Sequence, residues 1–197
     1  DNGFDVVTAK RHSDNKPGQL NKKLKVIKIS NNDNNWIADL EKVDVVISCL
    51  ASRTGVPKDA YLVDYKLNCL LLEKAKALKC SQFILLSAIC VQKPTLAFQF
   101  EKLAFEEELQ KSGLNFSIIR PTAYFKSLSG QVENIKKGKP YVYFGDGKLT
   151  QCNPISEKDL SLYILSCITD KNKWQKILPI GGPNQSLTPK DIGKILF

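Results

Sequence analysis

The sequence predicts an α/β fold built on a doubly wound parallel sheet, and three features indicate it. Apolar runs of strand length alternate with segments whose apolar residues recur at helical spacing. Residues 43–49 and 83–87 are almost continuously apolar, as expected of parallel strands covered on both faces. Turn residues separate the segments at intervals that suit right-handed strand–helix–strand crossovers.

The expected elements follow in chain order. Strands are expected at residues 4–9, 24–29, 43–49, 83–87 and 115–119, and helices at residues 57–78, 94–111 and 156–168. Ser156 with Asp159 three residues later predicts an N-cap for the last of these helices. After Thr122 the pattern is less regular, so we expect a single domain over residues 1–197 in which residues 122–197 contribute a smaller substrate lobe.

Both ends of this domain are expected to be truncated. Residues 1–3 look like a helix end that runs directly into a strand, and a helix beginning at Asp191 stops soon after it starts. The Gly-rich loop that holds the phosphates of a dinucleotide is expected just before Asp1, because these residues contain none.

Composition excludes several function classes. No run approaches the roughly 18 apolar residues of a membrane span. The formal charge of +9 comes from 26 Lys and only 3 Arg, without an arginine-rich helix, so we interpret it as biased composition and expect no nucleic-acid partner. An anionic small ligand is compatible with this charge. The six Cys form no C-x-x-C pair and His12 is the single His, so no metal site is expected and most Cys are expected in the core.

The three arginines all follow predicted strands, where ligands bind in a doubly wound sheet. Arg11 ends a strand with no acidic residue before Asp14, a pattern that favours the 2′-phosphate of NADPH over the 2′-hydroxyl of NADH. For Arg53, ligand binding and a local structural role explain the position equally well. Arg120 is better explained as a residue that fixes the turn at Pro121.

A helix after the strand at residues 83–87 carries Phe98 and Lys102, one turn apart on one face. Short-chain dehydrogenases have Tyr-x-x-x-Lys at this place, where the Lys binds the nicotinamide ribose. Here Phe98 occupies the Tyr position and has no proton to donate. Lys102 is our catalytic candidate, and its replacement by Ala is expected to lower turnover with the fold intact. The alternative is a solvated surface lysine.

Longer strings carry a family resemblance over nearly the whole chain, weakest at residues 13–41. The strings resemble the divinyl chlorophyllide 8-vinyl reductases, which are atypical short-chain dehydrogenases of the isoflavone-reductase-like group. They comprise residues 43–53, 83–94, 98–99, 102–103, 105–106, 120–123, 125–128, 138–142, 144–149, 154–157 and 178–183. The resemblance implies NADPH-dependent reduction of the 8-vinyl group of divinyl chlorophyllide or protochlorophyllide to ethyl. Phe98 is usual in that group.

The resemblance also implies a location and a set of contacts. The protein is expected in the chloroplast, or in the cytoplasm or at the thylakoid of a bacterium, with peripheral association to a thylakoid or envelope membrane. The expected cofactor contacts follow the strand ends: Arg11, Cys49, Leu50, Ala51, Ser52, Arg53, Ser87, Ala88, Lys102, Pro121 and Thr122. The expected pigment contacts are Phe98, Phe125, Tyr143 and Phe144, although core packing would equally explain the aromatic stretch at residues 141–144. No proton donor and no oligomeric state is assigned.

Two other functions remain open. A non-enzymatic relative that binds NADPH during photosystem assembly would tolerate the loss of the Tyr, but residues 87–94 resemble the reductases. An isoflavone-reductase-like enzyme would share the fold and Lys102, but is not expected to have residues 144–147 and 178–183.

Overall fold

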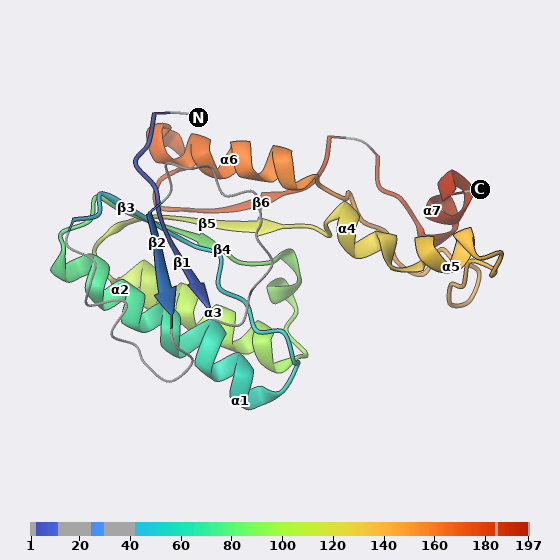
Figure 1. Cartoon of the computed structure of the whole chain (residues 1–197), viewed down its shortest axis with the longest axis horizontal. Helices are drawn as coiled ribbons and strands as arrows, with labels where there is room; N and C mark the ends of the chain where they lie inside the picture. The colour runs from blue at the N-terminus through green and yellow to red at the C-terminus, as the bar shows by residue number, and fades with distance from the viewer. Residues whose placement is uncertain (1–2, 12–24, 30–41, 184, 197) are drawn as a thin grey trace.

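Parallel strands form the centre of the molecule. The computed structural model describes residues 3–11, 25–29, 42–183 and 185–196 (Figure 1). Strand β1 (Val7–Arg11) pairs with β2 (Lys25–Ile29), and a second sheet has the order β3 (Val45–Ser48), β4 (Gln82–Leu86), β5 (Asn115–Pro121) and β6 (Lys176–Ile180). All four pairings are parallel. The predicted α/β fold with a parallel sheet is confirmed.

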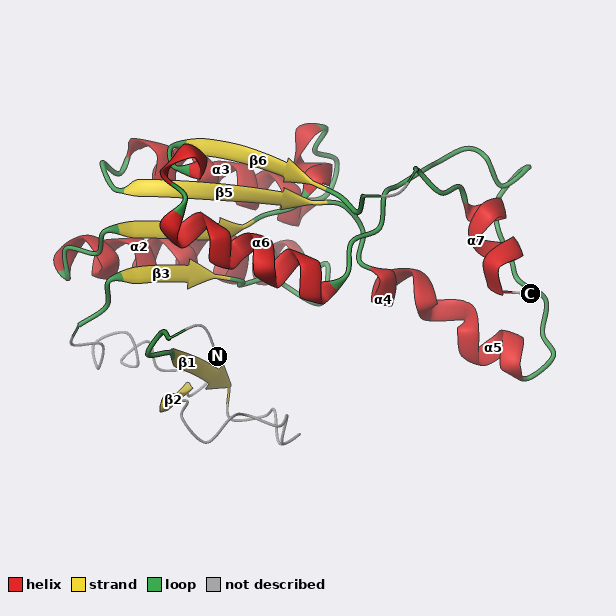
Figure 2. Cartoon of the chain, turned by 90° about the horizontal axis from the view of Figure 1, so that it is seen from above, coloured by secondary structure: helices red, strands yellow, loops and turns green. Residues whose placement is uncertain are grey.

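Helices cover both faces of the four-stranded sheet (Figure 2). On one face lie α3 (Ala97–Lys111) and a continuous helix made of α1 (Pro57–Ala60), a π-helical turn (Tyr61–Lys66) and α2 (Leu67–Ala77). On the other face lies α6 (Glu157–Thr169). Ser156 caps α6 as predicted, because its Oγ accepts the Asp159 N–H at 3.0 Å.

The core follows the strand alternation. Phe83 and Leu85 pack with Phe105 under α2 and α3, while Ile84 packs with Leu160 under α6. The three β4 residues and Phe105 are at most 1% exposed. Burial of each such side chain contributes about 1.5–3 kcal/mol to the stability of the fold. This explains why the sequence of β4 is apolar without interruption.

Short elements lie beyond the carboxyl ends of β5 and β6. There α4 (Phe125–Leu128), α5 (Val132–Lys136) and α7 (Pro189–Leu196) lie away from the sheet, whereas α6 and β6 return to it (Figures 1 and 2). The projecting residues, 125–153, 183 and 185–196, are called the lobe below. None of the helices in the described ranges has the length and apolarity to cross a bilayer.

Several predicted boundaries are corrected. The first strand begins at Val7 instead of residue 4. Helix α3 begins at Ala97, three residues after Pro94, because residues 89–92 form a 3-10 turn and Gln99 Oε1 accepts the Leu96 N–H at 2.9 Å. Strand β5 extends to Pro121, since β6 pairs with it that far.

The cysteines only partly match the expectation of core positions. Cys80 and Cys167 are buried and Cys69 and Cys152 are partly buried, but Cys49 and Cys90 are exposed. The two exposed thiols follow β3 and β4, where the chain leaves the core.

Candidate active site

The carboxyl ends of β3 to β6 meet at one edge of the sheet, because the four strands run parallel. Cys49 begins the segment after β3, Ser87 follows β4, Thr122 follows β5 and Gly181 follows β6. The lobe projects from the same edge (Figure 2). This edge therefore brings together most of the residues predicted to contact the cofactor.

Lys102 reaches this edge from α3 without meeting solvent. Its residue is 6% exposed; its Nζ lies 3.0 Å from Asp64 Oδ1 and donates to the Leu50 carbonyl at 3.2 Å. The alternative of a solvated surface lysine is wrong, because the ammonium is enclosed between α3, the π-helical turn and the segment after β3.

Asp64 is the buried counter-charge that sequence reasoning missed. It lies on the π-helical turn, is 1% exposed, and its carboxylate accepts the Ser52 N–H at 3.3 Å. Asn68, one helical turn later, donates to the Asp64 carbonyl at 3.0 Å and accepts the Ser48 hydroxyl at 2.5 Å. Two polar residues four apart on an otherwise apolar helix face were the available signal.

A second buried network joins β4, α3 and β5. Glu106 is 1% exposed, and its carboxylate accepts the Ser87 hydroxyl at 2.5 Å and is paired with Arg120 Nη2 at 2.5 Å. Arg120 Nε donates to the same carboxylate at 3.2 Å. The structural interpretation of Arg120 therefore holds, with Glu106, not the turn at Pro121, as its partner.

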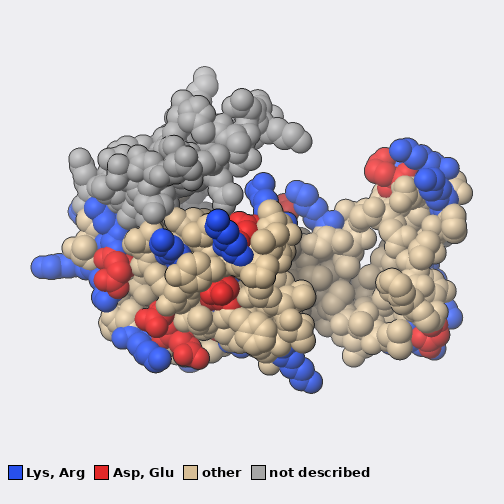
Figure 3. All heavy atoms as spheres, turned by 90° about the horizontal axis from the view of Figure 1, so that it is seen from below, with Lys and Arg blue, Asp and Glu red and all other residues tan. Residues whose placement is uncertain are grey.

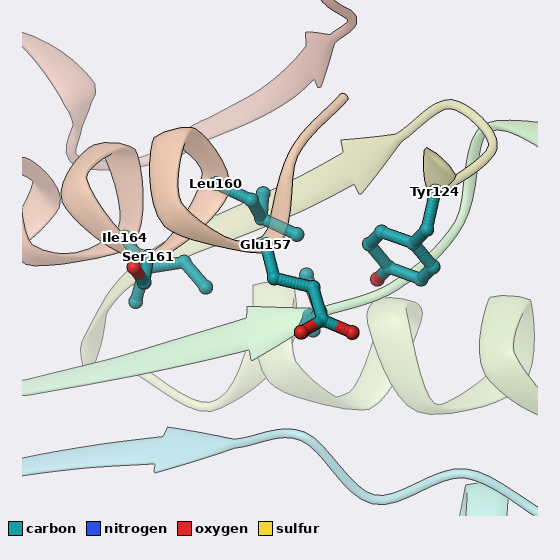
Figure 4. A pocket seen from close by; sticks show the side chains of 6 residues that line it. Tyr124, Glu157, Leu160, Ser161 and Ile164 are labelled. Carbon is teal, nitrogen blue, oxygen red and sulfur yellow. The ribbon is translucent and has the colours of Figure 1, made fainter. Parts of the chain in front are cut away.

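A hollow of about 220 Å³ opens on the α6 side of the edge (Figure 4). It is lined by Leu86, Tyr124, Glu157, Leu160, Ser161 and Ile164. Desolvation raises the pKa of Tyr124, and the nearby Cys49 and Glu157 raise it further. Desolvation also raises the pKa of the Cys49 thiol, although the residue is exposed overall, and the Lys102 ammonium opposes this rise.

The other predicted cofactor residues are placed as follows. Ala51 and Arg53 are exposed after β3, and the Arg53 N–H donates to Asp59 Oδ2 at 3.1 Å. Ala88 is partly buried and Pro121 is buried.

Two more cofactor residues lie at strand ends. The Thr122 hydroxyl donates to the Asn153 carbonyl. Arg11 ends β1, but its side chain lies outside what the structure describes.

The predicted pigment residues fall into two groups. Phe98 is partly buried on α3 near Lys102, whereas Phe125 is 51%, Tyr143 39% and Phe144 90% exposed on the lobe. Core packing does not explain Phe144. Tyr143 and Phe144 line a separate hollow of about 390 Å³ in the lobe.

The edge around Lys102 is the place where ligands bind in a sheet of this kind. The Lys102 ammonium is a hydrogen-bond donor held at the strand ends, and Cys49, Ala51 and Arg53 in the neighbouring segment after β3 are exposed. Within the described ranges, no three His, Cys, Asp or Glu residues are grouped to hold a metal ion. Lys and Arg side chains are spread over the face in Figure 3 with Asp and Glu between them, which fits biased composition.

Comparisons with known proteins agree with this geometry. A family model described as NAD(P)H-binding matches residues 1–171. UDP-glucose 4-epimerase from Thermotoga maritima, solved with UDP-glucose, has a TM-score of 0.84 at 18% identity, covering 99% of this chain and 74% of that one. At this identity the likeness shows the fold, which is the Rossmann type.

Sequence relatives carry more specific names. Divinyl chlorophyllide a 8-vinyl-reductases, described as chloroplastic, are 47% identical in Cucumis sativus and 48% in Arabidopsis thaliana, over 99% of this chain. The chain spans about half of their length, 51%. Photosystem II assembly factor Ycf39 of Cyanophora paradoxa is 34% identical over 47% of this chain and 29% of its own length. The chain therefore belongs to the NAD(P)H-binding family and is a relative of the divinyl chlorophyllide a 8-vinyl-reductases over the half of their length that it spans.

Proposed function

We propose that the protein reduces the 8-vinyl group of divinyl chlorophyllide or protochlorophyllide to an ethyl group, with NADPH as the hydride donor. The carrying observation is the 47–48% identity to 8-vinyl-reductases over 99% of the chain. Their description as chloroplastic supports a place in the chloroplast. The photosystem-assembly alternative is not favoured, because the Ycf39 similarity is weaker and covers 47% of the chain.

Lys102 is the residue proposed to hold the nicotinamide ribose. Bound NADPH would supply the hydride, and the chain would supply orientation and electrostatics. The Lys102 ammonium is held in place by Asp64 and the Leu50 carbonyl, so its position is set before the cofactor binds. Cys49, Leu50, Ala51, Ser52, Arg53, Ser87, Ala88, Pro121 and Thr122 are proposed to line the cofactor, with Arg11 at the 2′-phosphate.

The lobe is proposed to receive the pigment. Phe125, Tyr143 and Phe144 expose aromatic surface there, and Phe98 borders the Lys102 site. Flat apolar side chains suit a tetrapyrrole plane. The same exposed aromatic surface is proposed to contact a thylakoid or envelope membrane peripherally. Such a pigment would partition into that membrane.

The test is pigment conversion by the full-length protein. Divinyl chlorophyllide is incubated with NADPH or with NADH, and the products are separated by chromatography. We expect the monovinyl product with NADPH. No ethyl product under conditions in which a known 8-vinyl-reductase works would contradict the proposal.

A further inference from the structure

Reduction of a vinyl group needs a proton as well as a hydride. Phe98, which lies beside Lys102 on α3, cannot supply the proton. A phenyl ring has no acidic hydrogen. Two hydroxyls at the edge are already engaged, because Ser87 donates to Glu106 and Thr122 donates to the Asn153 carbonyl. Another side chain with an acidic hydrogen at the ends of the strands is therefore a candidate for the donor.

Tyr124 is such a side chain. It lies three residues beyond the end of β5, is fixed by a parallel bridge to Ile155, and is half-buried. Its ring lines the 220 Å³ hollow together with Leu86 at the tip of β4 and Glu157 in the first turn of α6. Figure 4 shows the phenol oxygen on the side of the ring that faces the Glu157 carboxylate.

Tyr124 and Lys102 both reach the carboxyl ends of the parallel strands, because Tyr124 follows β5 and Lys102 donates to the Leu50 carbonyl after β3. The Lys102 ammonium opposes the rise in the pKa of Cys49, and the negative form of Cys49 raises the pKa of Tyr124. Lys102 belongs to α3 on one face of the sheet, while Tyr124 packs toward α6 on the other. The segment after β3 that binds Lys102 and the segment after β5 that carries Tyr124 thus lie at the same edge of the sheet, with β4 between the two strands.

We propose that Tyr124 is the proton donor of the vinyl reduction, an inference that rests on the proposed function. The hydride of NADPH forms a new C–H bond at one vinyl carbon, and NADPH becomes NADP⁺. The vinyl π bond breaks and its electron pair moves to the adjacent carbon or the conjugated macrocycle. The Tyr124 O–H bond then breaks, its proton completes the ethyl group, and the phenolate regains a proton from water that enters the hollow beside Glu157.

The surroundings of Tyr124 raise the pKa of the phenol, so the protonated form persists to more alkaline pH than for an ordinary tyrosine. Desolvation raises the pKa of Tyr124, followed by the negative forms of Cys49 and Glu157. Cys49 belongs to the segment after β3, and Glu157 lies in the first turn of α6. A protonated phenol is the form that a proton donor requires.

The first test compares Tyr124→Phe with Tyr163→Phe in the full-length protein. Tyr163 is a partly buried phenol on α6 outside the hollow, and desolvation raises its pKa too, so the control removes the same atom from a similar setting. We expect Tyr124→Phe to lower kcat about a hundredfold or more, the range for loss of a general acid, with unchanged NADPH affinity in a fluorescence titration. Tyr163→Phe should keep wild-type kcat. Wild-type kcat in Tyr124→Phe would overturn the assignment while leaving the proposed function standing.

A second measurement separates proton donation from a structural role. Tyr124 is replaced by 3,5-difluorotyrosine, which keeps the ring and hydroxyl but lowers the pKa of the phenol. We expect the alkaline fall of kcat to move to lower pH, and Tyr163 replaced in the same way should not move it. If the alkaline fall of kcat does not move with 3,5-difluorotyrosine at position 124, the proposal is overturned. It is also overturned if that fall moves in Cys49→Ala and not with the replaced Tyr124. If the wild-type protein forms no ethyl product, the proposed function fails and this inference fails with it.

Discussion

At the residue scale, the Lys102–Asp64 pair shows how a buried charge is used for position. Taking both groups out of water costs several kcal/mol per ion, which their attraction only partly offsets. The pair ties α3 to the segment after β3, because Lys102 donates to Leu50 and Asp64 accepts from Ser52. Such a pair adds little to the free energy of unfolding, but it restricts the Lys102 ammonium to a narrow range of positions at the sheet edge.

Lys102→Met tests both roles of the ammonium. Removing it leaves Asp64 buried without a counter-charge, so we expect the free energy of unfolding to fall by about 3–5 kcal/mol and turnover to fall sharply. This replaces the sequence-based expectation that the fold is unaffected by loss of Lys102. Urea denaturation and pigment turnover are measured together.

A double variant separates stability from catalysis. Asp64→Asn with Lys102→Met removes both charges, so stability should largely return while turnover stays low. Lys111→Met is the matched control on α3, since its pair with Glu107 at 3.6 Å is exposed. Recovery of turnover in the double variant would exclude Lys102 from the active site.

Arg11 decides the choice between NADPH and NADH in our proposal. Arg11→Asp replaces a partner of the 2′-phosphate by a repelling carboxylate, and a charge-assisted hydrogen bond is worth about 1.5–3 kcal/mol. We expect NADPH affinity to fall roughly tenfold or more while NADH affinity changes little. Lys10→Asp, at the neighbouring position of β1, is the control. Equal losses for both cofactors would assign Arg11 a structural role.

At the element scale, the sequence predicted the strands and long helices well where burial dictates the residues. β4 and α6 were found nearly to the residue, because continuous apolar runs and a Ser cap are local signals. The π-helical turn was missed, since no local pattern distinguishes it from α-helix. Asp64 was missed with it, because a buried carboxylate is recognised only when its partner, 38 residues away in sequence, is placed beside it.

Glu106 illustrates the same limit on α3. The sequence shows only an acidic residue on a helix, yet the fold buries it between Ser87 and Arg120. Three elements are joined there, since Ser87 follows β4 and Arg120 lies on β5. The network fixes α3 along the sheet and so also fixes Lys102 one helical turn earlier.

Arg120→Met should destabilise the protein through Glu106. The buried carboxylate would lose both guanidinium contacts, and we expect the free energy of unfolding to fall by about 3–5 kcal/mol. Lys136→Met removes an exposed pair with Glu133 at 2.8 Å, which is worth at most about 1 kcal/mol. Both are measured by urea denaturation. Equal small effects would mean that the Glu106 network adds nothing to stability.

At the scale of the whole molecule, the sheet and the lobe are joined by three crossing segments. The Thr122 N–H donates to the Ile180 carbonyl at 2.9 Å, the Ile155 N–H to Ala123 at 3.0 Å, and the Gly182 N–H to Asn153 at 3.1 Å. Tyr124 lies in the first of these segments. The crossing therefore sets both the orientation of the lobe and the position of the proposed proton donor.

Gly182 is the tightest point of this crossing. A Cβ added there would overlap the Pro154 carbonyl oxygen, a backbone atom that cannot turn aside. Gly182→Ala should therefore push the segment after β6 away from residues 153–154, and overpacking of this kind costs about 1–3 kcal/mol.

Gly130 is the matched control, because a Cβ there meets nothing within 4 Å and its backbone conformation is ordinary. We expect Gly182→Ala to lower the melting temperature, and to lower pigment turnover more than NADPH affinity. Thr122 is a proposed cofactor residue in the crossing, whereas Lys102 and its partners lie on α3, the π-helical turn and the segment after β3. Gly130→Ala should behave as wild type in all three measurements. Loss of NADPH affinity in Gly182→Ala to the same degree as turnover would show that the crossing also shapes the cofactor site, and an unchanged melting temperature would show that the two segments can separate without cost.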